Sequence, residues 1–323
     1  MTVFIIRRLV QSVGVLLATA VLVFLGVFAI GNPVDILIAP DATMAERTQV
    51  IHSLGLDKPL WEQFGLFLWN ALHGDLGRSF VFNQPSISVI FQRLPATLEL
   101  TFVAFVFALA IGVPLGLWSG LKPGTATDET VMTGSIFGFS LPSFWQGIML
   151  IMIFSVWLGW LPSTGRGRVG EFLGIHSSLF TLDGWGHLIL PAINLSLFNM
   201  ALIIRLTRTG VRETMPLDFI KFARAKGLTH RRIVFVHVFK NILIPLITVV
   251  GLELGNMLAF AVVTETIFAW PGVGKLLIDS IMRLDRPVVV AYLLVIVTVF
   301  IFINFVVDVL YSVLDPRIRL GGA

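Results

Sequence analysis

Long apolar stretches dominate the hydrophobic pattern of the chain. They recur six times and contain few charges, over residues 9–30, 98–118, 131–160, 187–204, 242–263 and 288–310. A helix needs about 20 consecutive apolar residues to cross the hydrocarbon core of a bilayer. The pattern therefore predicts an all-α polytopic membrane protein with six transmembrane helices.

The first apolar run is expected to remain in the mature protein. Arg7 and Arg8 precede it, and it is longer than the roughly 7 to 15 apolar residues of a signal peptide. No small-residue cleavage pattern follows it. We therefore expect residues 1–30 to form the N-terminal end and the first membrane helix, with a cleaved signal peptide as the alternative.

The composition supports a membrane protein and excludes several other classes. Hydrophobic residues make up 56% and charged residues 13% of the 323 positions, which is far too apolar for a soluble domain. The net charge of +4 is modest and does not indicate a nucleic-acid partner. Cysteine is absent, which excludes disulfides, thiol catalysis and cysteine-ligated metals.

Basic residues are concentrated in one segment, 205–240. Against only two acidic residues it contains nine basic ones: Arg205, Arg208, Arg212, Lys221, Arg224, Lys226, Arg231, Arg232 and Lys240. One Lys or Arg at the centre of a bilayer costs roughly 2.5 to 3.5 kcal/mol, so the pattern predicts an aqueous loop between two spans. The positive-inside rule places this loop in the cytoplasm.

That placement fixes the predicted topology of the whole chain. Both termini are then cytoplasmic, and residues 31–95, which have no basic excess, form an extracytoplasmic segment. A core of five further membrane helices covers 96–312, and 313–323 form a cytoplasmic tail.

The basic loop also has the local signals of a short helix. Pro216 suits its first position, Asp218 its first turn, and Gly227 the residue just past its end. Thr229 suits the cap of a second helix. One face of this helix is expected to be apolar, formed by Leu217, Ile220, Ala223 and Ala225. Such a helix suits docking to a soluble partner, and an ordinary basic cytoplasmic loop is the alternative.

One stretch of this loop resembles a known family. Residues 223–227, Ala-Arg-Ala-Lys-Gly, are similar to the EAA loop of ABC-importer permeases, in which the loop is the coupling helix that docks on the ATPase. Only Ala223 matches the family's Glu-Ala-Ala triplet, and its later Ile-x-Leu-Pro is absent at the usual spacing. These departures resemble the dipeptide, oligopeptide and nickel branch of the family.

Three separate stretches before the loop resemble the same branch. They are Leu-Gly-Leu-Asp-Lys-Pro-Leu at 54–60, Gly-Asp-Leu-Gly-Arg-Ser at 74–79 and Arg-Leu-Pro-Ala-Thr-Leu-Glu-Leu at 93–100. They occur in the family's order. The chain is thus identified as a member of this branch on four stretches.

The resemblance implies the permease subunit of an ATP-driven ABC importer, with the type I importer architecture, for di- or oligopeptides. It implies that this chain binds no cofactor and is not an enzyme, because ATP and Mg are held by separate ATPase subunits. The other implied partners are a homologous second permease and an extracytoplasmic solute-binding protein, at the bacterial cytoplasmic (inner) membrane. The residues implied in coupling to the ATPase are Pro216, Asp218, Ile220, Lys221, Ala223, Arg224, Ala225, Lys226 and Gly227.

Two alternatives stay open at this point. One is a nickel or other small-solute permease of the same branch. The other is a self-sufficient secondary transporter, against which no internal repeat of the two halves is visible.

Patterns that suggest catalytic or metal chemistry lead to no site. Residues 269–276 are faintly similar to a P-loop, but that motif needs Gly in place of Ala269 and Ser or Thr in place of Leu276. The six histidines show no metal-ligand spacing, and no nucleophile and base can be paired. We expect no catalytic residue and no metal site.

Two features interrupt the apolar runs, and one of them points to a solute pathway. Glu253 lies about midway along 242–263, and a carboxyl group inside a membrane favours a pathway, with Asn256 and Asn194 as companions. The alternative is a protonated structural glutamate bonded to one of those asparagines. The run 131–160 is interrupted at 140–143, which predicts a kink whose freed carbonyls are bonded by serine hydroxyls.

Overall fold

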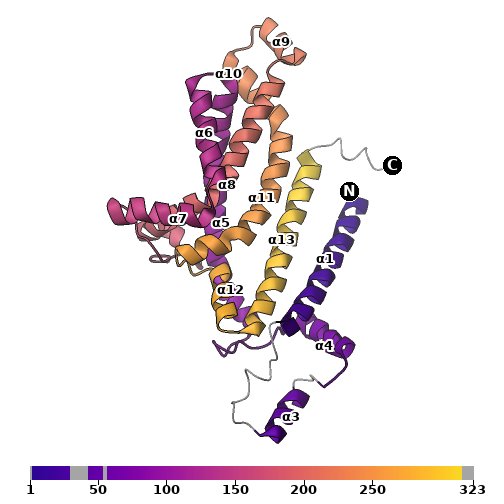
Figure 1. Cartoon of the computed structure of the whole chain (residues 1–323). Helices are drawn as coiled ribbons and strands as arrows, with labels where there is room; N and C mark the ends of the chain where they lie inside the picture. Colours follow the sequence, from indigo (N-terminus) through magenta and orange to yellow (C-terminus); the bar gives the residue numbers. More distant parts are fainter. Residues whose placement is uncertain (1, 30–42, 54–56, 315–323) are drawn as a thin grey trace. The chain divides into compact units, whose positions relative to one another are not determined.

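The computed structural model describes residues 2–29, 43–53 and 57–314, and this part of the chain is predominantly helical (Figure 1). Five helices are long and apolar enough to cross a membrane, and a bent helix pair raises the number to six if it counts as one span. Four of the five are α1 (Thr2–Ala29), α5 (Ser86–Leu121), α8 (Leu182–Thr214) and α13 (Arg286–Leu314). The fifth is the continuous stretch His230–Ile267, in which a π-helix (Ile233–Val238) joins α10 (His230–Arg232) to α11 (Phe239–Ile267). The predicted all-α membrane protein is confirmed to this extent.

The remaining elements are short. The bent pair is α6 (Ala126–Ser140) and α7 (Ser143–Leu150), which continues as a π-helix over Ile151–Trp157. The other helices are α3 (Met44–Ser53), α4 (Leu60–Leu72), α9 (Asp218–Ala225), α10 (His230–Arg232) and α12 (Val273–Met282). A hairpin of β1 (Gly170–Phe172) and β2 (Ile175–Ser177) and a 3-10 turn (Ser178–Phe180) precede α8.

One compact unit comprises residues Met1–Leu94 and Leu276–Ile301. Within it α1 packs on α4 through aromatic rings, with the Phe24 and Phe64 centroids 5.3 Å apart in an edge-on arrangement. The buried carboxylate of Asp285 accepts hydrogen bonds from the hydroxyl of Ser79 and from the backbone N–H of Phe80. These bonds tie the turn before α5 to the start of α13.

The other compact unit comprises residues Pro95–Lys275 and Phe302–Ala323. In it α6 and α11 both run along α8 (Figure 1). Three glycines of α5, spaced four residues apart, let this helix approach α8 closely. A Cβ on Gly112 would lie 2.9 Å from the side chain of Ile203. The corresponding distances are 2.6 Å for Gly116 and Thr207 and 2.8 Å for Gly120 and Val211. Small residues four apart are a common device for packing helices within a membrane.

The break between α6 and α7 is much sharper than a kink. The two helices are bent by 108°, at the predicted position around Pro142. The amide of Gln146 donates hydrogen bonds to the carbonyl oxygens of Gly138, at 2.9 Å, and Leu141, at 2.8 Å. The expectation that serine hydroxyls satisfy these carbonyls is therefore wrong, because a long side chain of the following helix reaches back to them.

The helices on either side of the basic segment are longer than predicted. Helix α8 begins at Leu182 and continues to Thr214, and helical structure resumes at His230. Only residues 215–229 lie between, so the flanking helices continue into the segment 205–240 at both ends. The helix tolerates Arg208 because this arginine has a buried acidic partner, Asp128, which the sequence did not reveal.

Parts of three predicted segments lie outside the described residues. In the predicted N-terminal segment 1–30 these are residues 1 and 30, and in the predicted external segment 31–95 they are residues 31–42 and 54–56. In the predicted tail 313–323 they are the residues from 315 onward. The described part of the predicted external segment includes α4, which begins directly after Pro59.

Candidate functional site

The short helix predicted in the basic segment is α9. It begins at Asp218, so Pro216 lies in the turn before it and not at its first position. Gly227 follows its end with a φ of +74°, which favours glycine and confirms the predicted stop. The side chain of Thr229 caps α10 by accepting a hydrogen bond from the backbone N–H of Arg232, also as predicted.

The apolar side of α9 is used within the chain. Ile220 is 0% exposed and Ala223 is 5% exposed. Both pack in one cluster with side chains from α5, α8, α11 and the π-helix that follows α10: Leu117, Val211, Ile233, Val238 and Ile242. Ile220 and Ala223 therefore hold α9 against the membrane helices and are not free to enter a groove of a partner, contrary to the expectation for these two residues.

The opposite side of α9 is aromatic and basic. Phe219 is 44% and Phe222 61% exposed, and the Nζ of Lys226 lies 4.5 Å from the Phe222 ring centroid. We call the exposed set the α9 face: Phe219, Lys221, Phe222, Arg224 and Lys226. The two phenylalanines were missed in the sequence, although their spacing of three places them on one side of a helix.

An ion pair connects α6 to α8 within the compact unit of residues Pro95–Lys275 and Phe302–Ala323. The carboxylate of Asp128 accepts hydrogen bonds from Nε and Nη2 of Arg208, at 2.6 and 2.9 Å. It also accepts from the hydroxyl of Ser119, at 2.5 Å, and from the backbone N–H of Gly124, at 3.0 Å. Asp128 is 4% exposed, so this pair fixes the turn between α5 and α6 on α8.

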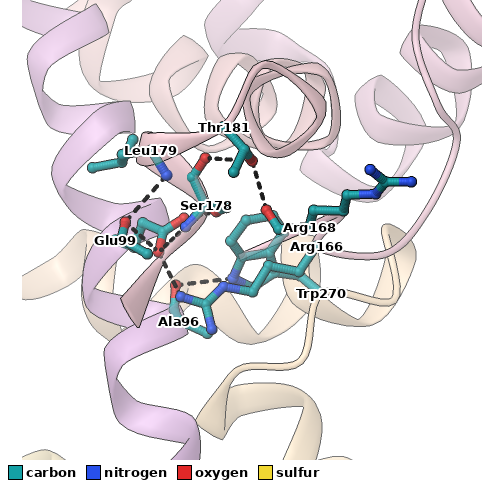
Figure 2. Close-up of polar contacts among 9 residues, drawn as sticks. Ala96, Glu99, Arg166, Arg168, Ser178, Leu179, Thr181 and Trp270 are labelled. Carbon is teal, nitrogen blue, oxygen red and sulfur yellow. Dashed lines mark hydrogen bonds and ion pairs between the residues drawn. The ribbon is translucent and has the colours of Figure 1, made fainter. Parts of the chain in front are cut away.

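A second polar cluster centres on Glu99 of α5 (Figure 2). Its carboxylate accepts hydrogen bonds from Arg166, at 2.5 Å, and from the hydroxyls of Ser177 and Ser178. One turn earlier, the carbonyl oxygen of Ala96 accepts a hydrogen bond from the indole of Trp270, at 2.9 Å. A single stretch of α5 therefore anchors both the segment before α8 and the turn after α11.

The turn after α11 is built around the buried carboxyl group of Glu265. The hydroxyl of Thr97 lies 2.5 Å from Oε1, and the backbone N–H of Lys275 donates to Oε2 at 2.9 Å. The glycines that are faintly similar to a P-loop thus face a carboxyl group of their own chain. The carboxyl group occupies the space beside Gly272 and Gly274 that a phosphate would need, which agrees with setting the nucleotide motif aside.

Replacing Gly272 by alanine is expected to destabilise the protein by about 1 to 3 kcal/mol, the usual cost of overpacking. Its Cβ would overlap the carboxyl group of Glu265 and the hydroxyl of Thr97. Thermal unfolding of the purified protein in detergent measures the effect. Gly65→Ala in α4 is the matched control, because no atom lies within 4 Å of its Cβ. Equal melting temperatures for the two variants would contradict this packing.

The three residues proposed for a solute pathway line one cavity. Glu253, Asn256 and Asn194 all border a space of about 390 Å³ at the α6–α7 break, between α8 and α11. The amide of Asn256 donates to Glu253 Oε1 at 3.3 Å, as the alternative interpretation expected. Asn194 instead donates to the hydroxyl of Thr264, at 2.9 Å. The structure thus brings the three together but pairs only two of them with each other.

Metal chemistry finds no support in the described ranges. Within residues 2–29, 43–53 and 57–314, no group of three His, Asp or Glu side chains could hold a metal ion. The polar clusters above are built from hydrogen bonds and ion pairs, which position helices and connecting segments.

Comparison with known families matches nearly the whole chain. Residues 112–320 match the model described as "Binding-protein-dependent transport system inner membrane component". Residues 1–101 match the model of the N-terminal part of such membrane components.

Curated relatives cover the full length as well. The chain is 40% identical over 333 residues to the "Dipeptide transport system permease protein DppB" of Escherichia coli (strain K12), covering 98% of each protein. It is 43% identical over 335 residues to the "Di/tripeptide transport system permease protein DppB" of Pseudomonas aeruginosa (strain UCBPP-PA14), again covering 98% of each.

Among solved structures, the fold is similar to inward-facing forms of the MetNI methionine ABC transporter. One form matches with a TM-score of 0.57 at 20% identity, covering 72% of this chain and 98% of that chain. A second crystal form matches with a TM-score of 0.54 at 19% identity, also covering 72% and 98%. At this level of identity the likeness concerns the fold.

Proposed function

Because the chain belongs to the family of binding-protein-dependent transport system inner membrane components, we propose that it is a membrane-spanning permease subunit of an ATP-driven importer of di- and oligopeptides. The structural observation that carries the proposal is α9. It is a short helix held between two spanning helices by a buried side and presenting an aromatic and basic face outward.

The family distinguishes between the alternatives left open by the sequence. A binding-protein-dependent system is not a self-sufficient secondary transporter, so that alternative is set aside. The relatives reported above carry peptide names, and this favours peptides over nickel or another small solute. The proposed substrate class, peptides, thus rests on relatives that match over 98% of their length.

The proposed assembly has several further subunits. Separate ATPase subunits bind ATP and Mg, a homologous second permease completes the pathway, and an extracytoplasmic solute-binding protein delivers the peptide. The complex lies in the bacterial inner membrane, with both termini and α9 on the cytoplasmic side. The concentration of basic residues in 205–240 supports this orientation through the positive-inside rule.

Coupling in this proposal runs through rigid contacts. The α9 face docks on an ATPase subunit, and the buried side of α9 carries its displacement to the membrane helices. Ile220 and Ala223 share one packed cluster with Leu117 of α5 and Val211 of α8, so α9 cannot shift without repacking them. The Asp128–Arg208 pair ties α6 to the same part of α8.

The orientation can be tested by cysteine labelling, because the natural chain has no cysteine. A cysteine in place of Lys226 is expected to react with an impermeant maleimide only after the cells are permeabilised. A cysteine in place of Asp57 is expected to react in intact cells. The reverse pattern, with uptake activity retained, would contradict the proposed topology.

A further inference from the structure

We propose that the cavity bordered by Glu253 binds a primary ammonium group, namely the free amino end of a peptide in transit. The inference rests on the proposed function and concerns the chemistry of one place in the pathway. The cavity of about 390 Å³ lies between the α6–α7 break, α8 and α11. Its polar lining residues include a carboxyl group and several amides, and none of its lining residues is Lys, Arg or His.

Two buried side-chain oxygens without a hydrogen-bond partner among the described residues belong to residues that border this cavity. Asn199 is 6% and Asn194 is 2% exposed, and both border the cavity. In the described part of the chain, the side-chain oxygen of each accepts no hydrogen bond. A buried polar atom without a partner costs about 1 to 3 kcal/mol, and such atoms in native proteins call for an explanation. Donors supplied by a solute provide one.

The charge of the cavity favours a cationic solute group. Glu253 forms no ion pair with a basic side chain within the described residues, and its one hydrogen bond from Asn256 is long, at 3.3 Å. A carboxyl group inside a membrane span is costly and normally faces a partner or a pathway. Arg205 is directed elsewhere, with its guanidinium 4.5 Å from the centroid of Phe139, which does not line the cavity.

The number and type of acceptors match an ammonium group. Glu253 Oε1 already accepts from Asn256, which leaves three side-chain oxygens, Glu253 Oε2 and the Oδ1 atoms of Asn194 and Asn199. A primary ammonium group has three N–H donors. The rings of Phe198 and Phe260 form part of the wall, and aromatic faces attract cations. A peptide carboxylate would instead meet the like charge of Glu253. The cavity therefore suits the amino end and not the carboxyl end of a peptide.

The shape of the chain at this place fits a pathway. The wall includes Gly138, Leu141 and Ser143 at the 108° break between α6 and α7. Irregular backbone at membrane depth is tolerated where it is buried in protein or lines a cavity. The carbonyl oxygens freed at the break accept hydrogen bonds from Gln146, so the break between α6 and α7 is a stabilised part of the fold.

Direct binding to the purified complex of both permeases and the ATPases, without the solute-binding protein, tests the inference. Equilibrium dialysis compares radiolabelled dialanine with N-acetyl-dialanine, which lacks the ammonium group. The wild-type complex is expected to bind dialanine about tenfold to a hundredfold more tightly, the range for a lost charge-assisted hydrogen bond. Glu253→Gln is expected to weaken dialanine binding by a similar factor and to remove the discrimination.

Asn199→Leu is a second variant, which keeps the charge and removes one acceptor, and it is expected to weaken dialanine binding by a smaller factor. Thr248→Val is the matched control, because this hydroxyl of α11 bonds the carbonyl oxygen of Ile244 and lies outside the cavity. Co-purification of the partner subunits verifies assembly of every variant.

Two results would overturn the ammonium assignment. One is unchanged discrimination in Glu253→Gln, and the other is competition by ethylammonium as strong as that by dialanine, which would assign the cavity to free amines. Failure of the proposed function looks different. In that case the complete wild-type system, with its binding protein, would show no ATP-dependent uptake of any peptide.

Discussion

Replacing Asp128 by asparagine is expected to destabilise the chain by about 3 kcal/mol, the lower end of the cost of breaking a buried ion pair from one side, because Arg208 is partly exposed. The reason is that Arg208 stays behind with its charge, while the carboxylate that accepted two of its N–H groups is gone. Denaturant titration of the purified protein in detergent measures the loss. The neighbouring bonds from Ser119 and Gly124 would weaken together with the pair.

Asp218→Asn is the matched control for this prediction. Asp218 also pairs with a basic residue, Lys221, at 2.8 Å, but its side chain is 95% exposed. Exposed pairs contribute about 0 to 1 kcal/mol, so the control is expected to be nearly neutral. A double variant, Asp128→Leu with Arg208→Met, should recover much of the loss because no charge is left buried. If Asp128→Asn and Asp218→Asn lowered the free energy of unfolding equally, a special stabilising role of the Asp128–Arg208 pair would be contradicted.

Replacing Phe222 by alanine is expected to weaken attachment of the ATPase subunit at least tenfold and to lower ATP-driven uptake accordingly. Phe222 is 61% exposed at the centre of the α9 face, and aromatic anchors of this kind often contribute more than 2 kcal/mol to a protein interface. Co-purification of the ATPase with the tagged permease, followed by uptake assays in proteoliposomes, measures both effects.

Stability separates this effect from misfolding. Because the Phe222 ring is exposed, its loss should leave the melting temperature of the isolated chain unchanged, whereas Ile220→Ala should lower it. Phe172→Ala in β1 is the matched control, since that ring is 60% exposed but lies on the hairpin before α8. Full attachment of the ATPase to Phe222→Ala would remove the α9 face from the docking surface.

Much of the architecture was predictable because the bilayer limits the possibilities. Length and apolar content identify spans, and a signal such as Gly227 ends a helix wherever it stands. The position of the break near Pro142 followed for the same reason. These features depend on local sequence alone, so they can be predicted without knowing which distant residues lie close together in the fold.

The errors concern contacts between residues that are distant in sequence. Asp128 lies 80 positions before Arg208, and without that pairing a cluster of arginines indicates a loop where a helix in fact continues. Likewise, the two sides of α9 could not be assigned, because both carry apolar residues and only the packing of Ile220 decides which side is buried. Glu253 could be singled out because it lies inside an apolar run, but the asparagine oxygens without a hydrogen-bond partner in the described part of the chain could not be predicted.

The most direct test of the proposed function is uptake by the complete complex in proteoliposomes. The chain is reconstituted with its second permease and ATPase subunits, with ATP inside the vesicles and with dialanine and the solute-binding protein outside. Accumulation of dialanine is expected only when ATP, functional ATPase subunits and the binding protein are all present. Accumulation by this chain alone, driven by an ion gradient without ATP, would contradict the assignment as an importer permease.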